Sequence, residues 1–246
     1  MTTPWIVLPG MAETAEEFAR VRELLPEIEL RVIDPSQTPV NAEPAVLRAA
    51  AGVPAEVAVG LIGHSIGGLA ALRWALNRPE EVARLVLVDA TLPSETGHRW
   101  LYPGTPAERV VRATLGLCGR VGLPWLIGPL VRRSMIRVGS VRKQDTLPKA
   151  TVRKLYRDSR CWQRFWIELT ASWIAAREVG KLLPGGGVPA VLLVATGGSS
   201  KVGADGWLAD QRELAAAISG TVEVLPDSAH LVHLDRPDAI AAAVRG

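Results

Sequence analysis

One stretch in the first third of the chain limits the possible folds more than any other. A continuous apolar run over 57–63 passes directly into a helical pattern over 67–77, and Gly63, Ser65 and Gly67 form a G-x-S-x-G pattern at the junction. Continuous apolar runs are typical of strands buried on both faces, as in parallel sheets. A sharp strand–turn–helix exposes the serine hydroxyl above the sheet, and a Cβ at either glycine would collide with neighbouring backbone. The sequence therefore predicts a nucleophile at Ser65 in an α/β domain.

The rest of the chain repeats this alternation of strands and helices. Its 246 residues suffice for one large α/β domain with an insertion. Candidate strands are 5–9, 29–34, 57–63, 84–89, 189–196 and 221–226, and helical patterns cover roughly 14–25, 44–51, 67–77, 206–218 and 236–245. We predict a six-stranded, mostly parallel, doubly wound sheet, built from residues 1–91 and 187–246.

Residues 92–186 interrupt the alternation with helical patterns and no clear strand, which predicts an inserted helical cap. The cap region holds five of the eight tryptophans: Trp100, Trp125, Trp162, Trp166 and Trp173. The last three, with Leu169, recur at helical spacing. This stripe predicts either a substrate-binding roof over an apolar pocket or the packing of a cap helix on its neighbours.

Positive charge is concentrated in the same region. The chain as a whole carries only +3, yet residues 99–181 hold 17 Lys or Arg against 5 Asp or Glu. The excess is compatible with solvated helix faces, or with a positive cap around Arg132, Arg133 and Arg137 that attracts an anionic partner, such as an acidic carrier protein or a carboxylated substrate. No nucleic-acid-binding module is recognisable, so we expect no nucleic-acid partner.

The elbow "GHSIGG" and the loop "VLPGMAETAEEF" resemble the alpha/beta-hydrolase family, specifically its cap-bearing esterase, lyase and C–C hydrolase branch. The resemblance implies a chain that starts at the family's third strand and lacks the first two. Pro9-Gly10 stands where the family usually has His-Gly. By that match Met11 would supply one oxyanion N–H, and Ile66, directly after the nucleophile, would supply the other at a helix N-terminus.

The segment "VEVLPDSAHLVHLDRP" follows the last predicted strand and contains two histidines. His230 comes after a small residue, as the catalytic histidine does in the family, and a neutral imidazole there could accept the Ser65 proton. We expect His233 to be a packing or loop-anchoring residue.

The third member of a triad is less obvious, because the usual family position, three residues after Gly197, is Ser200. A serine cannot carry the negative charge that stabilises an imidazolium. The alternatives are Asp89 at the carboxyl end of the strand after the elbow strand, Asp205 in the following loop, or a dyad without an acid. Disabling the acid costs roughly 10⁴ in turnover in a serine protease, so we favour Asp89.

These residues predict an ester or thioester hydrolase for a largely apolar small molecule, acting through an acyl-enzyme without metal or cofactor. The same fold and residues could instead catalyse elimination, cyclisation or C–C cleavage, or form a non-catalytic ligand-binding module. The N-terminus lacks signal-peptide features, and no run approaches ~18 apolar residues, so we expect a cytoplasmic protein with no membrane partner. Cys118 and Cys161 are expected to be free thiols.

Overall fold

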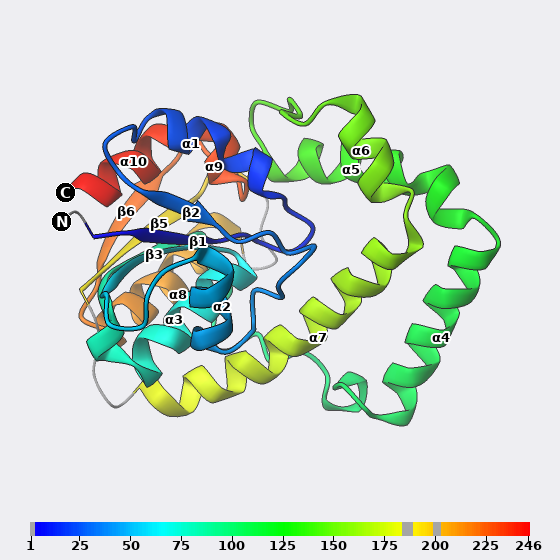
Figure 1. The fold of residues 1–246 in the computed structure, drawn as a ribbon, viewed down its shortest axis with the longest axis horizontal. Coiled ribbons are helices and arrows are strands. Elements are labelled where there is room, and N and C mark those ends of the chain that lie inside the picture. Colours follow the sequence, from blue (N-terminus) through cyan, green and yellow to red (C-terminus); the bar gives the residue numbers. More distant parts are fainter. Residues whose placement is uncertain (1–2, 184–188, 199–202) are drawn as a thin grey trace.

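A six-stranded sheet forms the centre of the computed structural model, which describes residues 3–183, 189–198 and 203–246 (Figure 1). The strands are β1 (Trp5–Leu8), β2 (Leu30–Val32), β3 (Val59–His64), β4 (Val82–Val88), β5 (Ala190–Ala195) and β6 (Thr221–Leu225). They lie in the order β2-β1-β3-β4-β5-β6, and every neighbouring pair is parallel. This architecture confirms the predicted fold class.

Helices cover both faces of the sheet (Figure 1). One face packs against α2 (Pro44–Ala51), α3 (Ile66–Asn77) and α8 (Gly203–Ala217), and the other against η1 (Ala15–Phe18), α1 (Ala19–Glu23) and α10 (Pro237–Arg245). Side chains of β4 alternate between the two cores: Leu85 and Leu87 enter the first, while Val86 and Val88 enter the second. Two short helices, η2 (Pro79–Glu81) and α9 (Val232–Asp235), complete the layers.

The cap is helical and lies to one side of the sheet (Figure 1). Between β4 and β5 the chain forms η3 (Arg99–Leu101), α4 (Pro106–Arg120), α5 (Leu123–Gly139), α6 (Lys149–Tyr156) and α7 (Ser159–Leu182). The long helix α7 returns from the cap to pack along α3, where Arg73 and Glu178 form an ion pair at 3.3 Å. The division at residues 92 and 186 stays a prediction, but all four α-helices fall inside it.

Buried polar contacts anchor the cap to two loops at the carboxyl edge of the sheet. Arg132 on α5 is buried between Glu17 of η1 at 2.6 Å and Asp145 at 2.8 Å. The Tyr156 hydroxyl on α6 donates to the carbonyl of Ala12 at 3.0 Å. The Asp235 carboxylate accepts hydrogen bonds from Ser140 Oγ at the end of α5 and from the Ala229 N–H. The cap therefore helps to place the loops that carry Met11 and His230.

Arg132 corrects one expectation from the sequence. Its guanidinium is enclosed by Glu17 and Asp145 and is 2% exposed, so it is not available to an anionic partner. Arg133 and Arg137 on the same helix are exposed. Cys118 and Cys161 are both free thiols.

The described segments contain no single helix that is long and apolar enough to cross a membrane. Only α4 and α5 taken together pass by length and composition, and they are bent by 104° at their junction.

Candidate active site

Ser65 lies in a strained turn between β3 and α3. Its backbone has φ 52° and ψ −122°, a conformation that residues other than glycine rarely adopt. The end of β4 and its following loop hold this turn: the Ser65 N–H donates to the carbonyl of Val88 at 3.1 Å, and the Thr91 N–H donates to the carbonyl of Ser65 at 3.0 Å. The nucleophile position is thus fixed on both sides by backbone hydrogen bonds.

The two glycines around Ser65 are required by close backbone approach. A Cβ at Gly67 would collide with the carbonyl oxygen of Leu8 on β1, and a Cβ at Gly63 would lie 2.5 Å from the carbonyl oxygen of Gly67. Neither neighbour can move without disturbing the sheet or the first turn of α3. The G-x-S-x-G pattern is therefore a packing requirement of this turn.

His230 and Asp89 are joined directly, as the sequence predicts. His230 Nδ1 lies 2.6 Å from Asp89 Oδ2. The other carboxylate oxygen, Oδ1, accepts the Ala195 N–H at 3.1 Å and the Trp207 Nε1–H at 2.8 Å. Because the carboxylate is an acceptor, the proton of a neutral His230 belongs on Nδ1, which leaves Nε2 as a free acceptor.

Of the two aspartates considered as acid partners, only Asp89 contacts His230 in the part of the chain that the structure describes. Asp205 lies exposed in the first turn of α8, whereas Asp89 is 5% exposed and contacts the imidazole. Ser200, at the usual family position, lies outside the described residues. The catalytic role of Asp89 stays a prediction, now with the required contact in place.

Ser65 Oγ makes no hydrogen bond within the described residues, so the contact between Ser65 and His230 that a triad requires is not formed in this structure. Catalytic hydrogen bonds are often long or poorly aligned without substrate and tighten in the reactive complex. The His230 side chain is 45% exposed, which leaves its ring reachable from solvent and substrate.

The two expected oxyanion donors flank this centre on separate elements. Ile66 is the first residue of α3, where backbone N–H groups have no intrahelical partner. Met11 lies in the turn after β1 and lines a cavity of about 550 Å³ together with His230. The cavity walls are completed by Val131, Met135, Val138 and Leu231 among others. Both positions are compatible with the expected oxyanion hole, which stays a prediction.

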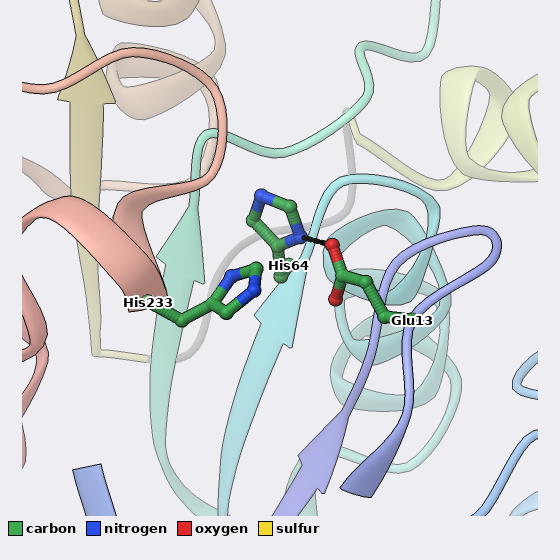
Figure 2. A group of neighbouring side chains, drawn as sticks. All are labelled: Glu13, His64 and His233. Atoms are coloured by element: carbon green, nitrogen blue, oxygen red, sulfur yellow. Dashed lines mark ion pairs between the residues drawn. The ribbon is translucent and has the colours of Figure 1, made fainter. Parts of the chain in front are cut away.

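A buried cluster behind the triad was not predicted from the sequence. Figure 2 shows Glu13, from the loop after β1, pointing toward His64 at the end of β3, with His233 of α9 beside them. Glu13 Oε1 and His64 Nδ1 are 2.5 Å apart, and both side chains are almost completely buried. The second Glu13 oxygen accepts the Gly10 N–H at 2.6 Å. The pair therefore joins the loop of Met11 to the residue before the nucleophile.

His64 also contacts the loop that carries His230. Its Nε2 lies 2.7 Å from the carbonyl oxygen of His230. Because the carbonyl oxygen only accepts, His64 Nε2 carries a proton, and one further proton lies between Nδ1 and the Glu13 carboxyl group. A neutral His64 with a protonated Glu13 satisfies both contacts, and so does a His64 imidazolium paired with a Glu13 carboxylate.

The pKa shifts agree with this ion pair. Burial raises the pKa of Glu13, but the charges of His64 and His233, with the hydrogen bonds of His64 and Gly10, lower it further to about 2. Burial lowers the pKa of His64, but the charge and hydrogen bond of Glu13 raise it above its ordinary value.

The same three residues resemble a metal-ligand set, since their ligand atoms lie within 4.8 Å of one another. Zinc needs ligands at about 2.0–2.2 Å around a common centre. Here Glu13 and His64 already contact each other directly, and His64 Nε2 is occupied by the His230 carbonyl. The direct contact between Glu13 and His64 therefore fits a proton held between these two side chains better than a metal ion bound by all three residues.

The five cap tryptophans lie in different surroundings, and two of them are on the surface. Trp100 and Trp125 are 62% and 58% exposed on the outer cap. On α7, Trp162 Nε1 donates to the carbonyl of Tyr156, and Trp166 packs edge-on against Trp173 with ring centroids 6.1 Å apart. None of the five lines the cavity beside His230. For the three α7 tryptophans this supports the packing alternative, and their substrate contacts stay a prediction.

Comparison with known proteins places the chain in a family. Residues 6–243 match the model of the alpha/beta hydrolase family, so this protein belongs to that family. No curated protein matches the sequence.

Solved structures share the fold at low sequence identity. An alpha/beta hydrolase fold protein from Burkholderia ambifaria is 16% identical with a TM-score of 0.70, over 99% of this chain and 90% of that one. Cfl2 from Burkholderia cenocepacia is 19% identical with a TM-score of 0.66, covering 99% and 87%. A loop variant of a haloalkane dehalogenase from Bradyrhizobium elkanii is 17% identical with a TM-score of 0.66, covering 99% and 88%. Family and neighbours support an enzyme of the hydrolase type.

Proposed function

We propose that this protein is a serine hydrolase that cleaves an ester or thioester through an acyl-enzyme. The observation that carries the proposal is the 2.6 Å contact between His230 Nδ1 and Asp89, next to Ser65 in its strained elbow. A binding module has no need for an oriented histidine close to a half-buried serine in a strained turn.

The proposed reaction has two steps, acylation of Ser65 and hydrolysis of the acyl-enzyme. In the first step Ser65 Oγ attacks the carbonyl carbon while His230 Nε2 takes the serine proton. The resulting oxyanion accepts hydrogen bonds from the backbone N–H groups of Met11 and Ile66. Collapse breaks the bond to the leaving alcohol or thiol, which receives the proton from His230. Water, deprotonated by His230, then releases the acid and restores Ser65. Asp89 stabilises the imidazolium in both halves.

The cavity beside His230 supports a largely apolar acyl group. Its lining includes the side chains of Met11, Val131, Met135, Val138 and Leu231, next to the imidazole. Such a surface contributes roughly 25 cal/mol for each Å² of apolar area removed from water.

A basic groove on the cap supports an acidic carrier of that acyl group. A cavity of about 670 Å³ between α5 and α6 is lined by Arg133, Arg137, Lys143, Lys149 and Arg153, which form no ion pair with any described residue. Complementary charge of this kind speeds association and fixes orientation. We propose an acidic protein that presents the acyl chain as a thioester.

The test is a panel of 4-nitrophenyl esters and acyl thioesters of increasing chain length, assayed with wild type and Ser65→Ala. The proposal expects turnover in wild type, loss in the variant, and labelling of Ser65 by a fluorophosphonate. Turnover that survives in Ser65→Ala would reject nucleophilic catalysis. Labelling without turnover of any ester would favour elimination, cyclisation or C–C cleavage at the same site.

A further inference from the structure

Glu168 is a buried carboxylate of the cap that has no hydrogen-bond partner among the residues that the structure describes. It lies on the inner side of α7 and is 3% exposed. Neither of its oxygens makes a hydrogen bond, and it forms no ion pair within the described residues. Arg164, one helical turn earlier and half-buried, acts on it only through its charge. A buried carboxylate without donors costs free energy, and no contact within this part of the chain compensates for it.

The Glu168 side chain lines a cavity of about 380 Å³ between the cap and the sheet. The other walls come from residues 12–16 after β1, residues 34–37 after β2, and the ends of α6 and α7. Tyr156 and Phe165 supply aromatic surface. This cavity and the one beside His230 both include Glu13 in their walls, so the loop that carries Met11 borders both of them.

The charges around this cavity favour a hydrogen-bond donor near Glu168. Burial raises the pKa of Glu168, the charge of Arg164 lowers it, and the charge of Glu13 raises it further, so that the pKa is about 7. The cavity is lined by two basic residues, Lys154 and Arg164, and by four acids: Glu13, Glu16, Asp34 and Glu168. What Glu168 lacks is a local donor.

We infer that Glu168 is a specificity-determining residue of the active site, and that it accepts a hydrogen bond from a hydroxyl or ammonium group of the substrate. This inference rests on the proposed hydrolase function. The donor group enters the cavity between α6, α7 and the loops after β1 and β2, while the ester carbonyl is presented at Ser65. An acyl chain with a donor at a distance from its carbonyl satisfies both requirements.

The experiment compares three 4-nitrophenyl esters of the same length: hexanoate, 6-hydroxyhexanoate and 6-aminohexanoate. Each is assayed with wild type, Glu168→Gln and Glu178→Gln. The last is the control, because Glu178 lies on the same helix and loses the same charge but does not line this cavity. Glutamine has the shape of glutamate but only one acceptor oxygen, so the substitution changes hydrogen bonding more than packing. Thermal unfolding of each variant shows whether it is folded.

The inference expects wild type to prefer a donor-bearing ester to hexanoate by about tenfold or more in kcat/KM, as a hydrogen bond to a charged group gives. Glu168→Gln should abolish the preference for the amine over hexanoate and reduce that for the hydroxyl. Glu178→Gln should keep both preferences. Equal ratios in wild type and Glu168→Gln, or no preference in wild type, would overturn the inference.

A binding measurement separates this inference from the proposed function. If none of the esters is hydrolysed, the hydrolase proposal fails, and calorimetry with methyl 6-aminohexanoate and methyl hexanoate then tests Glu168 alone. Tighter binding of the amine to wild type, lost in Glu168→Gln, would support the inference. Equal binding of the two esters, or no binding, would overturn it.

Discussion

Asp89 shows how one side chain can be held for a single task. One oxygen contacts His230, while the other accepts the Ala195 N–H of β5 and the Trp207 indole of α8. Donors from two elements therefore fix the orientation of the carboxylate, and the carboxylate fixes the orientation and tautomer of the imidazole.

Replacing Asp89 with Asn tests that role. The amide can donate to Nδ1 and favour the wrong tautomer, so we expect kcat to fall by roughly 10³–10⁴ with KM little changed, by analogy with a serine protease. Steady-state kinetics with the best ester of the panel measures this. Asp205→Asn, an exposed acid on α8, should remain within twofold, and an equal loss in both variants would contradict the assignment.

The Glu13–His64 pair acts through other residues rather than on the substrate. It connects Gly10, before Met11, with the carbonyl of His230. If His230 and Met11 act as proposed, His64 positions the base and Glu13 positions the loop of the oxyanion donor. His233 and Asp89 are the other charged or titratable groups that act on the pair.

Glu13→Gln should reduce the free energy of unfolding by roughly 3 kcal/mol at pH 6, because it leaves a buried imidazolium without its counter-charge. The pKa of Glu13 falls from 4.5 to about 2 on folding, so its contribution is complete above pH 4.5 and is lost as the pH falls toward 2. Urea unfolding should therefore show a smaller difference between wild type and variant at pH 3 than at pH 6.

The matched control for that measurement is Glu16→Gln, an exposed neighbour in η1, which should stay within about 0.5 kcal/mol of wild type. A Glu13→Gln protein as stable as wild type at pH 6, or a difference independent of pH, would show that the pair is not ionised.

At the scale of elements, the sequence predicts the core better than the cap. Strands and helices of the core follow from local apolar patterns, and the structure shifts their ends by only one to three residues. The acid partner of His230 required the positions of neighbouring strands, which is why Asp89 remained one of three alternatives. The Glu13–His64 contact depends on how the loop after β1 folds back, and periodicity carries no such information.

The cap differs more from the sequence prediction than the core does, because its helices carry large apolar residues on their exposed faces as well as on their buried ones. Apolar residues such as Leu117, Leu126 and Leu130 remain exposed on α4 and α5, together with Trp125. A pattern of large apolar residues therefore did not identify the inner face. On α7 the inner face is marked by one of its two acids, Glu168, which lies among buried small residues such as Ser172 and Ala175.

The cap helix α7 should make stability depend on pH through Glu168. Burial and the nearby Glu13 raise its pKa from 4.5 to about 7, with Arg164 opposing them, so the folded state holds the proton more tightly than the unfolded state. Stability is then lost as the pH rises from about 4.5 to 7. Glu168→Gln removes this loss, and its stability relative to wild type should increase across that range by up to about 3 kcal/mol. Chemical unfolding at pH 4.5 and 7.5 measures it, and a constant difference would contradict it.

At the scale of the whole molecule, one side of the cap is attached to the sheet domain and another side carries a positively charged groove. Its inner side is fastened to the sheet by Arg132, Tyr156 and Asp235, so it helps to shape the site. Its outer side carries the unpaired cations of the groove between α5 and α6. The positive charge that stood out in the sequence is thus divided between a buried anchor and an exposed groove.

The exposed groove predicts salt-sensitive catalysis with an acidic carrier. With an acyl chain attached to an acidic carrier protein, kcat/KM should fall severalfold between 20 and 300 mM salt, while the same acyl group on a small neutral thiol should show little change. Arg133→Glu combined with Arg137→Glu should weaken the first reaction and spare the second. Equal salt dependence for both substrates would argue against docking at this groove.

The central claim, an acyl-enzyme on Ser65 formed with His230 and Asp89, is tested most directly by rapid-quench mass spectrometry with an activated ester. The account predicts a wild-type protein whose mass increases by one acyl group, mapped to the peptide that contains Ser65. It predicts slow or absent acylation in Asp89→Asn and none in Ser65→Ala. Turnover without any acylated protein, or with the acyl group on another residue, would contradict it.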